Sequence, residues 1–325
     1  MMIIAIASLL IGAYFLLKGS EWVTDSSNTV ASKLGTSNIA IGLIFVSIML
    51  SLPELLVALS ALIKDHEQIS VGVSLGSVIV NLGLVLGITV FFKTIRVPKH
   101  VVTRDGVFML VATLVVSLIA LEDFEITSRD GLIFILLFIA YIINVYAQEK
   151  QLASKEKKRE INELSKTLII FGKLHNFAVV KNGFHIFIIG GILLIVGSEI
   201  FTRGLIDLSI LLSISDALLG VTLGALGPSL PNLVVAIQAS RKGFDELAVS
   251  QSIGSNIFTL FVTLGIIAIA QPIVLPEKFG LVTAPALILI TVVAFVFLLR
   301  GKIGKHEGLI LLGLYVLSIL AEFLY

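Results

Sequence analysis

The chain of 325 residues contains no cysteine and only one tryptophan. Without cysteine it can form no disulfide framework, thiol nucleophile, iron–sulfur cluster or thiolate zinc site. It also lacks an H-E-x-x-H zinc motif and a Gly-rich phosphate loop of the Walker type. No basic patch interleaved with aromatic residues indicates nucleic acid as a partner. These absences favour a protein that is neither an enzyme nor an ATP-driven pump, and no cofactor is expected.

Charge is scarce as well, since only 14% of the residues are charged, against about 25% in soluble domains. Hydrophobic residues make up 57% of the chain, and the mean hydropathy is +1.07. The apolar residues form blocks of roughly 20, the length of a helix that crosses a bilayer. We therefore predict an all-α membrane protein with lipid around it and ten spanning helices, at residues 2–17, 38–63, 69–92, 105–121, 131–148, 183–202, 217–240, 246–270, 280–299 and 306–324.

Lysine and arginine are distributed unequally between the connections that join these helices. If the N-terminus is outside, 19 of the 23 Lys and Arg residues lie on the cytoplasmic side. The positive-inside rule therefore predicts that both termini are outside the cell membrane. The polar segment 148–182 would then be a cytoplasmic basic linker, and a solvated connector is its simplest interpretation.

An internal repeat relates the two sides of this linker at a constant offset of 178 positions, without a gap over nearly seventy residues. The clearest matches are Gly19-Ser20-Glu21 with Gly197-Ser198-Glu199, Ser51-Leu52-Pro53 with Ser229-Leu230-Pro231, and Gly76-Ser77 with Gly254-Ser255. Each copy holds five helices, an odd number, so the second copy enters the membrane from the opposite side. Inverted repeats of this kind are typical of secondary transporters. The expected organisation is a first five-helix repeat at 1–147, the linker at 148–182 and a second repeat at 183–325.

The repeated motifs gather oxygen atoms within the membrane. Ser51-Leu52-Pro53-Glu54 and Ser229-Leu230-Pro231-Asn232 each place a proline inside a helix, where it frees a backbone carbonyl. In helices three and eight, Ser77 and Asn81, and then Ser255 and Thr259, repeat a four-residue spacing that puts each pair on one face. Hydroxyl, carboxylate and carbonyl oxygens are hard ligands that suit sodium, calcium or magnesium.

Glu54 is the residue that favours ion transport most strongly. A carboxyl group in the middle of a span costs several kcal/mol and usually marks an ion or proton pathway. Burial favours the neutral acid, whereas a bound cation favours the carboxylate, so protons and cations are expected to compete at Glu54. The competing interpretation is a protonated glutamic acid with a purely structural hydrogen bond.

These residues resemble the cation/calcium antiporter superfamily, in particular the prokaryotic sodium/calcium exchangers. That family has two inverted five-helix halves, each with a repeat of the type G-T-S-L-P-E followed by G-N-x-x-G-S-N-I. The resemblance implies transported cations, sodium or calcium or protons, as the inorganic partners. It also implies cation ligands from the side chains of Ser51, Glu54, Ser77, Asn81, Ser229, Asn232, Ser255 and Thr259, with backbone oxygen from Ser47 and Ala225.

The chain departs from the family pattern where charge matters most. Asn232 stands where a calcium exchanger has a second glutamate, and Thr259 stands where helix eight often carries an aspartate. Leu50 and Pro228 replace the threonines that precede the two serines. With Glu54 as the one site carboxylate, a calcium ion would keep about one uncompensated positive charge, which is costly away from water. A monovalent cation or a proton would be neutralised.

Three functions therefore stay open at this point. The first is a secondary cation antiporter with altered ion selectivity, sodium or proton coupled, in which helices one and six move. The second keeps the fold as a channel-like or binding-only protein without coupling. The third, an intramembrane enzyme, lacks support because all five histidines fall in connections or near helix ends. The sequence leaves the exchanged ions, the stoichiometry and the oligomeric state open.

Overall fold

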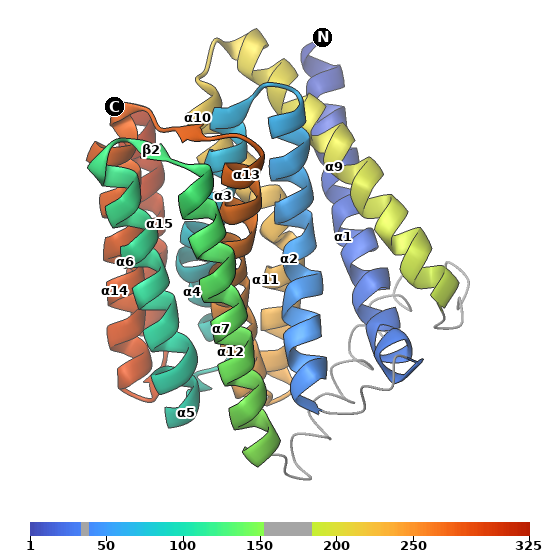
Figure 1. Ribbon diagram of the computed structural model, residues 1–325, viewed down its shortest axis with the longest axis vertical. Coiled ribbons are helices and arrows are strands. Elements are labelled where there is room, and N and C mark those ends of the chain that lie inside the picture. The colour runs from blue at the N-terminus through green and yellow to red at the C-terminus, as the bar shows by residue number, and fades with distance from the viewer. Residues whose placement is uncertain (34–38, 153–183) are drawn as a thin grey trace.

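The computed structural model describes residues 1–33, 39–152 and 184–325, and it is built almost wholly from helices (Figure 1). The first half contains α1 (Met2–Lys33), α2 (Ile39–Ile63), α3 (Glu67–Ile79), η1 (Val80–Val85), α4 (Leu86–Phe92), α5 (Lys99–Val101), η2 (Val102–Gly106), α6 (Val107–Glu122) and α7 (Ser128–Leu152). The second half contains α9 (Phe184–Leu212), α10 (Asp216–Leu219), η3 (Gly220–Gly224), α11 (Ala225–Arg241), α12 (Asp245–Phe258), η4 (Thr259–Thr263), α13 (Leu264–Ala270), η5 (Phe279–Thr283), α14 (Ala284–Leu299) and α15 (Lys305–Leu324). The segments named η are π-helical turns within longer helices.

The helical stretches agree with the predicted spans. Within the described ranges, nine helices are long and apolar enough to cross a membrane. The remaining predicted span corresponds to α2, which is 25 residues long. Most of the linker 148–182 lies outside the described residues, so its predicted role stays a prediction.

Two helices are longer than the sequence pattern predicted. The predicted spans 2–17 and 183–202 end near Gly-Ser-Glu clusters, but α1 continues to Lys33 and α9 to Leu212. The polar clusters do not end these helices because Glu21 and Glu199 find basic partners. Glu21 pairs with Lys18 at 2.7 Å, and Glu199 pairs with Arg203 at 2.7 Å. Pairs spaced by three or four residues support a helix instead of terminating it.

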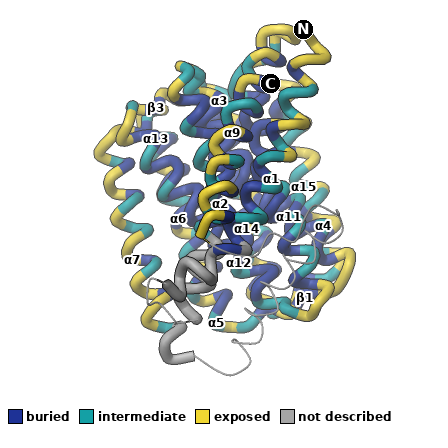
Figure 2. The backbone as a smooth tube through the Cα atoms, turned by 90° about the vertical axis from the view of Figure 1, so that its right-hand side faces the viewer, coloured by how far each residue is buried: buried dark blue, intermediate teal, exposed yellow. Residues whose placement is uncertain are grey.

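Two short antiparallel ribbons join the halves of the molecule. The strand β1 (Ile95–Arg96) pairs with β4 (Lys302–Ile303), and β2 (Glu125–Ile126) pairs with β3 (Ile273–Val274). Figure 2 shows β1 near the lower end of the molecule and β3 near the upper end. Each half thus supplies one strand at each end, as expected for two copies in opposite orientations.

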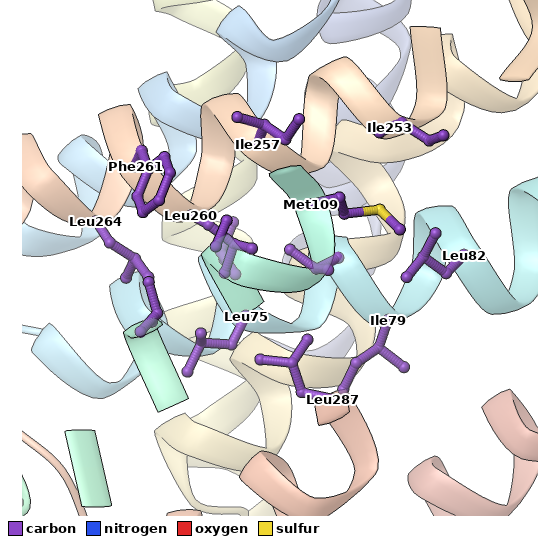
Figure 3. Packing of buried hydrophobic residues seen from close by; sticks show 14 of the residues in the cluster. Leu75, Ile79, Leu82, Met109, Ile253, Ile257, Leu260, Phe261, Leu264 and Leu287 are labelled. Carbon is purple, nitrogen blue, oxygen red and sulfur yellow. The ribbon is translucent and has the colours of Figure 1, made fainter. Parts of the chain in front are cut away.

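The centre of the molecule is packed with apolar side chains from both halves. Every residue of α3 from Ile69 to Ile79 is buried. Figure 3 shows Leu75 and Ile79 of α3 beside Leu260 of η4 and Leu287 of α14. The outer helices instead carry many exposed apolar residues, and Figure 2 shows exposed residues along α7 and α9. An apolar outer surface of this extent suits a lipid environment.

The helices α1 and α9 cross along one edge of the bundle (Figure 1). Glycines let them approach closely. A Cβ atom added at Gly19 would lie 2.8 Å from the carbonyl oxygen of Gly190, and one added at Gly190 would lie 3.0 Å from that of Gly19. Small residues at such crossings are the usual device for close helix packing in membranes. The pair α1–α9 is therefore one packed unit beside the remaining helices.

Candidate functional site

The site is built where α2 and α11 carry their prolines. Pro53 lies inside α2, and Pro228 and Pro231 lie inside α11. Proline has no N–H group, so Pro53 leaves the carbonyl of Met49 without its helical donor, and Pro231 does the same for Gly227. Glu54 and Asn232 directly follow these prolines. Both polar side chains therefore stand beside locally loosened backbone.

Glu54 lies fully buried between the two halves. Its Oε1 accepts a hydrogen bond from Asn232 Nδ2 at 2.9 Å and another from Ser229 Oγ at 3.3 Å. Its Oε2 is buried and has no hydrogen-bond partner among the described residues. A carboxylate usually accepts several hydrogen bonds when it is buried, because an unmet acceptor is costly. One oxygen of Glu54 is thus available to a ligand.

Asn232 lies at the centre of this network. Its Nδ2 donates to Glu54 Oε1, and it is 3.3 Å from Asn81 Oδ1 and 3.1 Å from Ser255 Oγ. Its Oδ1 accepts from Gln251 Nε2 at 2.6 Å. Asn232 is fully buried, so these protein groups replace water around it. The amide nitrogen stands among oxygens contributed by α2, η1 and α12.

Two further helical stretches complete the walls of the site. Ser51 Oγ donates to Ser255 Oγ at 2.8 Å, which links α2 to α12. The hydroxyls of Ser77 and Thr259 are buried without a hydrogen-bond partner in the described part of the chain. Asn81 lies in the π-helical turn η1, and Thr259 begins the π-helical turn η4. Such turns displace side chains from regular helical positions and are frequent at functional sites.

The site lies where the two repeats meet. Glu54 and Asn232 are 178 positions apart and occupy the same place in their repeats, yet they touch each other. The hydroxyls of Thr113 and Thr291 are also 178 positions apart and lie 3.4 Å from each other. Residues equivalent by a two-fold relation can be in contact only close to its axis. Glu54 and Asn232 are therefore at the pseudo-two-fold axis of the molecule.

Six of the predicted site residues are joined by these hydrogen bonds, namely Ser51, Glu54, Asn81, Ser229, Asn232 and Ser255. Ser77, Ala225 and Thr259 are buried as well. Ala225 begins α11 directly after the π-helical turn η3. Ser47 lies outside the residues whose side chains the structure describes. Whether these residues hold a cation stays a prediction.

Two residues of the network were not predicted. Gln251 bonds Asn232, and Asn256 Oδ1 accepts from Asn81 Nδ2 at 3.0 Å. Gln251 lies one helical turn before Ser255, on the same face of α12. That spacing could have identified it. Asn256 adjoins Ser255 in sequence, and nothing in its spacing indicated that it would bond a residue of the first half.

The site contains little charge. Among the residues that the structure describes, no group of three or more His, Asp or Glu could hold a metal ion. Glu199, the counterpart of Glu21 in the second repeat, does not belong to this network. It bonds Lys64 at 2.7 Å and Ser60 at 3.0 Å, and so it ties α9 to α2. Glu54 is consequently the one carboxylate within the hydrogen-bond network described above.

The chain matches known proteins over nearly its whole length. The family model of the sodium/calcium exchanger protein matches residues 4–147 and 182–324. The sodium/calcium exchanger MaX1 of Methanosarcina acetivorans is 30% identical over 341 residues, with 97% of each chain covered. The inner membrane protein YrbG of Escherichia coli is 29% identical and covers 83% of this chain and 81% of its own.

A solved structure has the same arrangement of helices. The sodium-calcium exchanger NCX_Mj, soaked with 2.5 mM Na+ and 0.1 mM Ca2+, superimposes with a TM-score of 0.68 at 27% identity, covering 98% of this chain and 99% of the other. The agreement includes both five-helix halves, because the coverage is almost complete. On these grounds the chain is an integral membrane protein of ten helices in two inverted repeats, and it belongs to the sodium/calcium exchanger family.

Proposed function

We propose that the chain is a secondary cation antiporter of the sodium/calcium exchanger type. In this proposal one cation site, between α2, α3–η1, α11 and α12–η4, opens alternately to the two sides of the membrane. The observation that carries the proposal is the buried Oε2 of Glu54, which has no hydrogen-bond partner among the described residues, on a carboxyl group held by Ser229 and Asn232. Buried oxygens without hydrogen-bond donors suit a cation, because a cation supplies the missing positive partner.

We infer further that the ion selectivity differs from that of a site with two or more carboxylates. Asn232 and Thr259 are neutral, so a bound sodium ion or proton would be balanced by Glu54, whereas calcium would keep one uncompensated charge. Calcium would then bind more weakly than at an acidic site. The same charge balance favours a second candidate function, exchange of a monovalent cation for protons.

The moving part in this proposal is the α1–α9 pair. These helices pack on each other through glycines, and they lie beside α2 and α11, the two helices that carry Glu54 and Asn232 (Figure 1). A packed pair can slide as one body over the rest. The proposed orientation, with both termini outside and the linker 148–182 in the cytoplasm, rests on the distribution of Lys and Arg.

The proposal is tested by tracer uptake of calcium or sodium into proteoliposomes loaded with the opposite ion. An antiporter requires the counter-ion, so uptake should fall to background when the internal counter-ion is replaced by choline. Proton coupling would appear as uptake that follows an imposed pH gradient. Uptake that proceeds equally without any counter-ion would show a channel-like protein instead.

A further inference from the structure

Gln251 holds the side chain of Asn232 in one direction. Glu54 supplies the starting point, because its Oε1 accepts hydrogen bonds from both Ser229 Oγ and Asn232 Nδ2, which leaves the unpartnered Oε2 as the oxygen that a proton would occupy. The group of Asn232 that lies 2.9 Å from Glu54 Oε1 must therefore be its amide nitrogen. The amide oxygen then faces the opposite way, and Gln251 Nε2 donates to it at 2.6 Å.

This direction decides what Asn232 offers to a cation. The nitrogen points among Glu54 Oε1, Asn81 Oδ1 and Ser255 Oγ, at distances from 2.9 to 3.3 Å. A cation that used the same oxygens would have to take the place of this N–H group. Asn232 could contribute its own oxygen only after its carboxamide turned over, which breaks the bond to Gln251.

Gln251 is suited to this task and has no other polar bond in the described part of the chain. It is 1% exposed, and its Oε1 is buried without a partner. It lies on α12 one turn before Ser255, so the same helix provides a site oxygen and the group that orients Asn232. The equivalent position in the first repeat is Val73, which cannot form such a bond.

From this geometry we propose that Gln251 is a positioning residue that sets the ion preference of the site by keeping the oxygen of Asn232 away from the cation. The proposal rests on the function proposed above. Losing one oxygen ligand weakens binding of a divalent cation more than binding of a monovalent one, because affinity for calcium follows the number and charge of its oxygen ligands. Gln251 thus weakens the binding of calcium relative to that of a monovalent cation.

The test replaces Gln251 by methionine, which keeps the length of the side chain without its donor. The measured quantity is the calcium concentration that half-inhibits tracer sodium uptake into proteoliposomes, divided by the half-saturating sodium concentration. In Gln251→Met this ratio should fall about threefold to tenfold, the factor that one net hydrogen bond is worth. The neighbouring Ser252→Ala removes a hydroxyl that bonds only its own helix, at Ala248, and serves as the matched control.

A second variant keeps the proposal testable if Gln251→Met does not give monodisperse protein. Gln251→Leu also lacks the donor and adds no charge, so it should release the carboxamide of Asn232 in the same way. The ratio should then fall about as far as in Gln251→Met. An unchanged ratio in either folded variant would overturn the proposal.

The last arm separates positioning from direct binding. In an Asn232→Ala background Gln251 has no carboxamide to orient, so adding Gln251→Met should change the ratio less than about twofold. A change as large as in the wild-type background would make Gln251 a ligand itself and contradict the proposal. If the wild type exchanged no cation at all, the proposed function would fail instead, before any variant was compared.

Discussion

In the first repeat the site carries Glu54 and Asn81, whereas the equivalent positions of the second repeat are Asn232 and Thr259. The backbone does not share this asymmetry. Both repeats have a proline directly before the first of these positions and a π-helical turn at or beside the second. The repeat therefore fixes where oxygen atoms stand, and a few side chains decide how much charge they carry.

The difference between the repeats also explains why the two central residues touch in a defined direction. A carboxylate only accepts and a carboxamide can donate, so Glu54 and Asn232 form a hydrogen bond across the pseudo-two-fold axis. Two carboxylates at this distance would repel each other unless a proton or cation lay between them. Because Asn232 is neutral, it can contact Glu54 directly without an ion between the two side chains.

The largest effect is expected when the carboxylate that distinguishes the first repeat from the second is removed. Glu54→Gln leaves a neutral site that cannot balance a buried cation, so cation-dependent uptake should fall at least about 100-fold. Glu307→Gln, which removes a carboxylate in the first turn of α15, is the control and should keep uptake close to that of the wild type. Full uptake by folded Glu54→Gln would move the transport site elsewhere.

A smaller effect is expected when the charge is moved from one repeat to the other. The double variant Glu54→Asn with Asn232→Glu keeps one carboxylate next to the pseudo-two-fold axis. Because the two positions are equivalent, it should recover uptake to within about tenfold of the wild type, whereas Glu54→Asn alone should not. Initial rates of tracer sodium uptake measure this recovery. If the double variant were as inactive as the single one, positions 54 and 232 would not be functionally equivalent, and this prediction would be wrong.

The smallest effect concerns packing in α9, where two adjacent glycines differ. A Cβ atom at Gly190 would lie 2.9 Å from the backbone nitrogen of Val23, whereas one at Gly191 would meet nothing within 4 Å. Gly190→Ala should lower the free energy of unfolding by about 1–3 kcal/mol, since it pushes α1 away. Gly191→Ala should be neutral or raise it by about 0.5–1 kcal/mol, because alanine favours a helix. Thermal unfolding in detergent compares the pair, and equal melting temperatures would contradict the close crossing.

The sequence predicted the helices and the repeat because apolar length and spacing are local properties of the chain. It also grouped the site residues, since a proline beside Glu54 and its counterpart beside Asn232 are visible without a structure. It did not predict the full length of α1 and α9, because polar residues such as Glu21 and Glu199 are held by ion pairs that composition does not reveal.

The network around Asn232 could not be predicted in the same way. Its bond to Gln251 spans two helices that are joined by a turn, and its bond to Asn81 joins the two halves. Both depend on how helices pack and on which way a carboxamide faces. Neither property follows from the spacing of residues along one helix. The spacing along α12 could place Gln251 on the same face as Ser255, but it could not predict that Gln251 bonds Asn232.

The most direct test of this account restores the acid that the second repeat lacks. Tracer calcium uptake driven by an opposing sodium gradient is compared between wild type and Asn232→Glu in proteoliposomes, with Asn232→Gln as the neutral control. A second carboxylate should lower the half-saturating calcium concentration at least about tenfold, because charge then balances the divalent ion. Asn232→Gln should show no such gain. Equal calcium affinity in wild type and Asn232→Glu would contradict the claim that the neutral second repeat sets the selectivity.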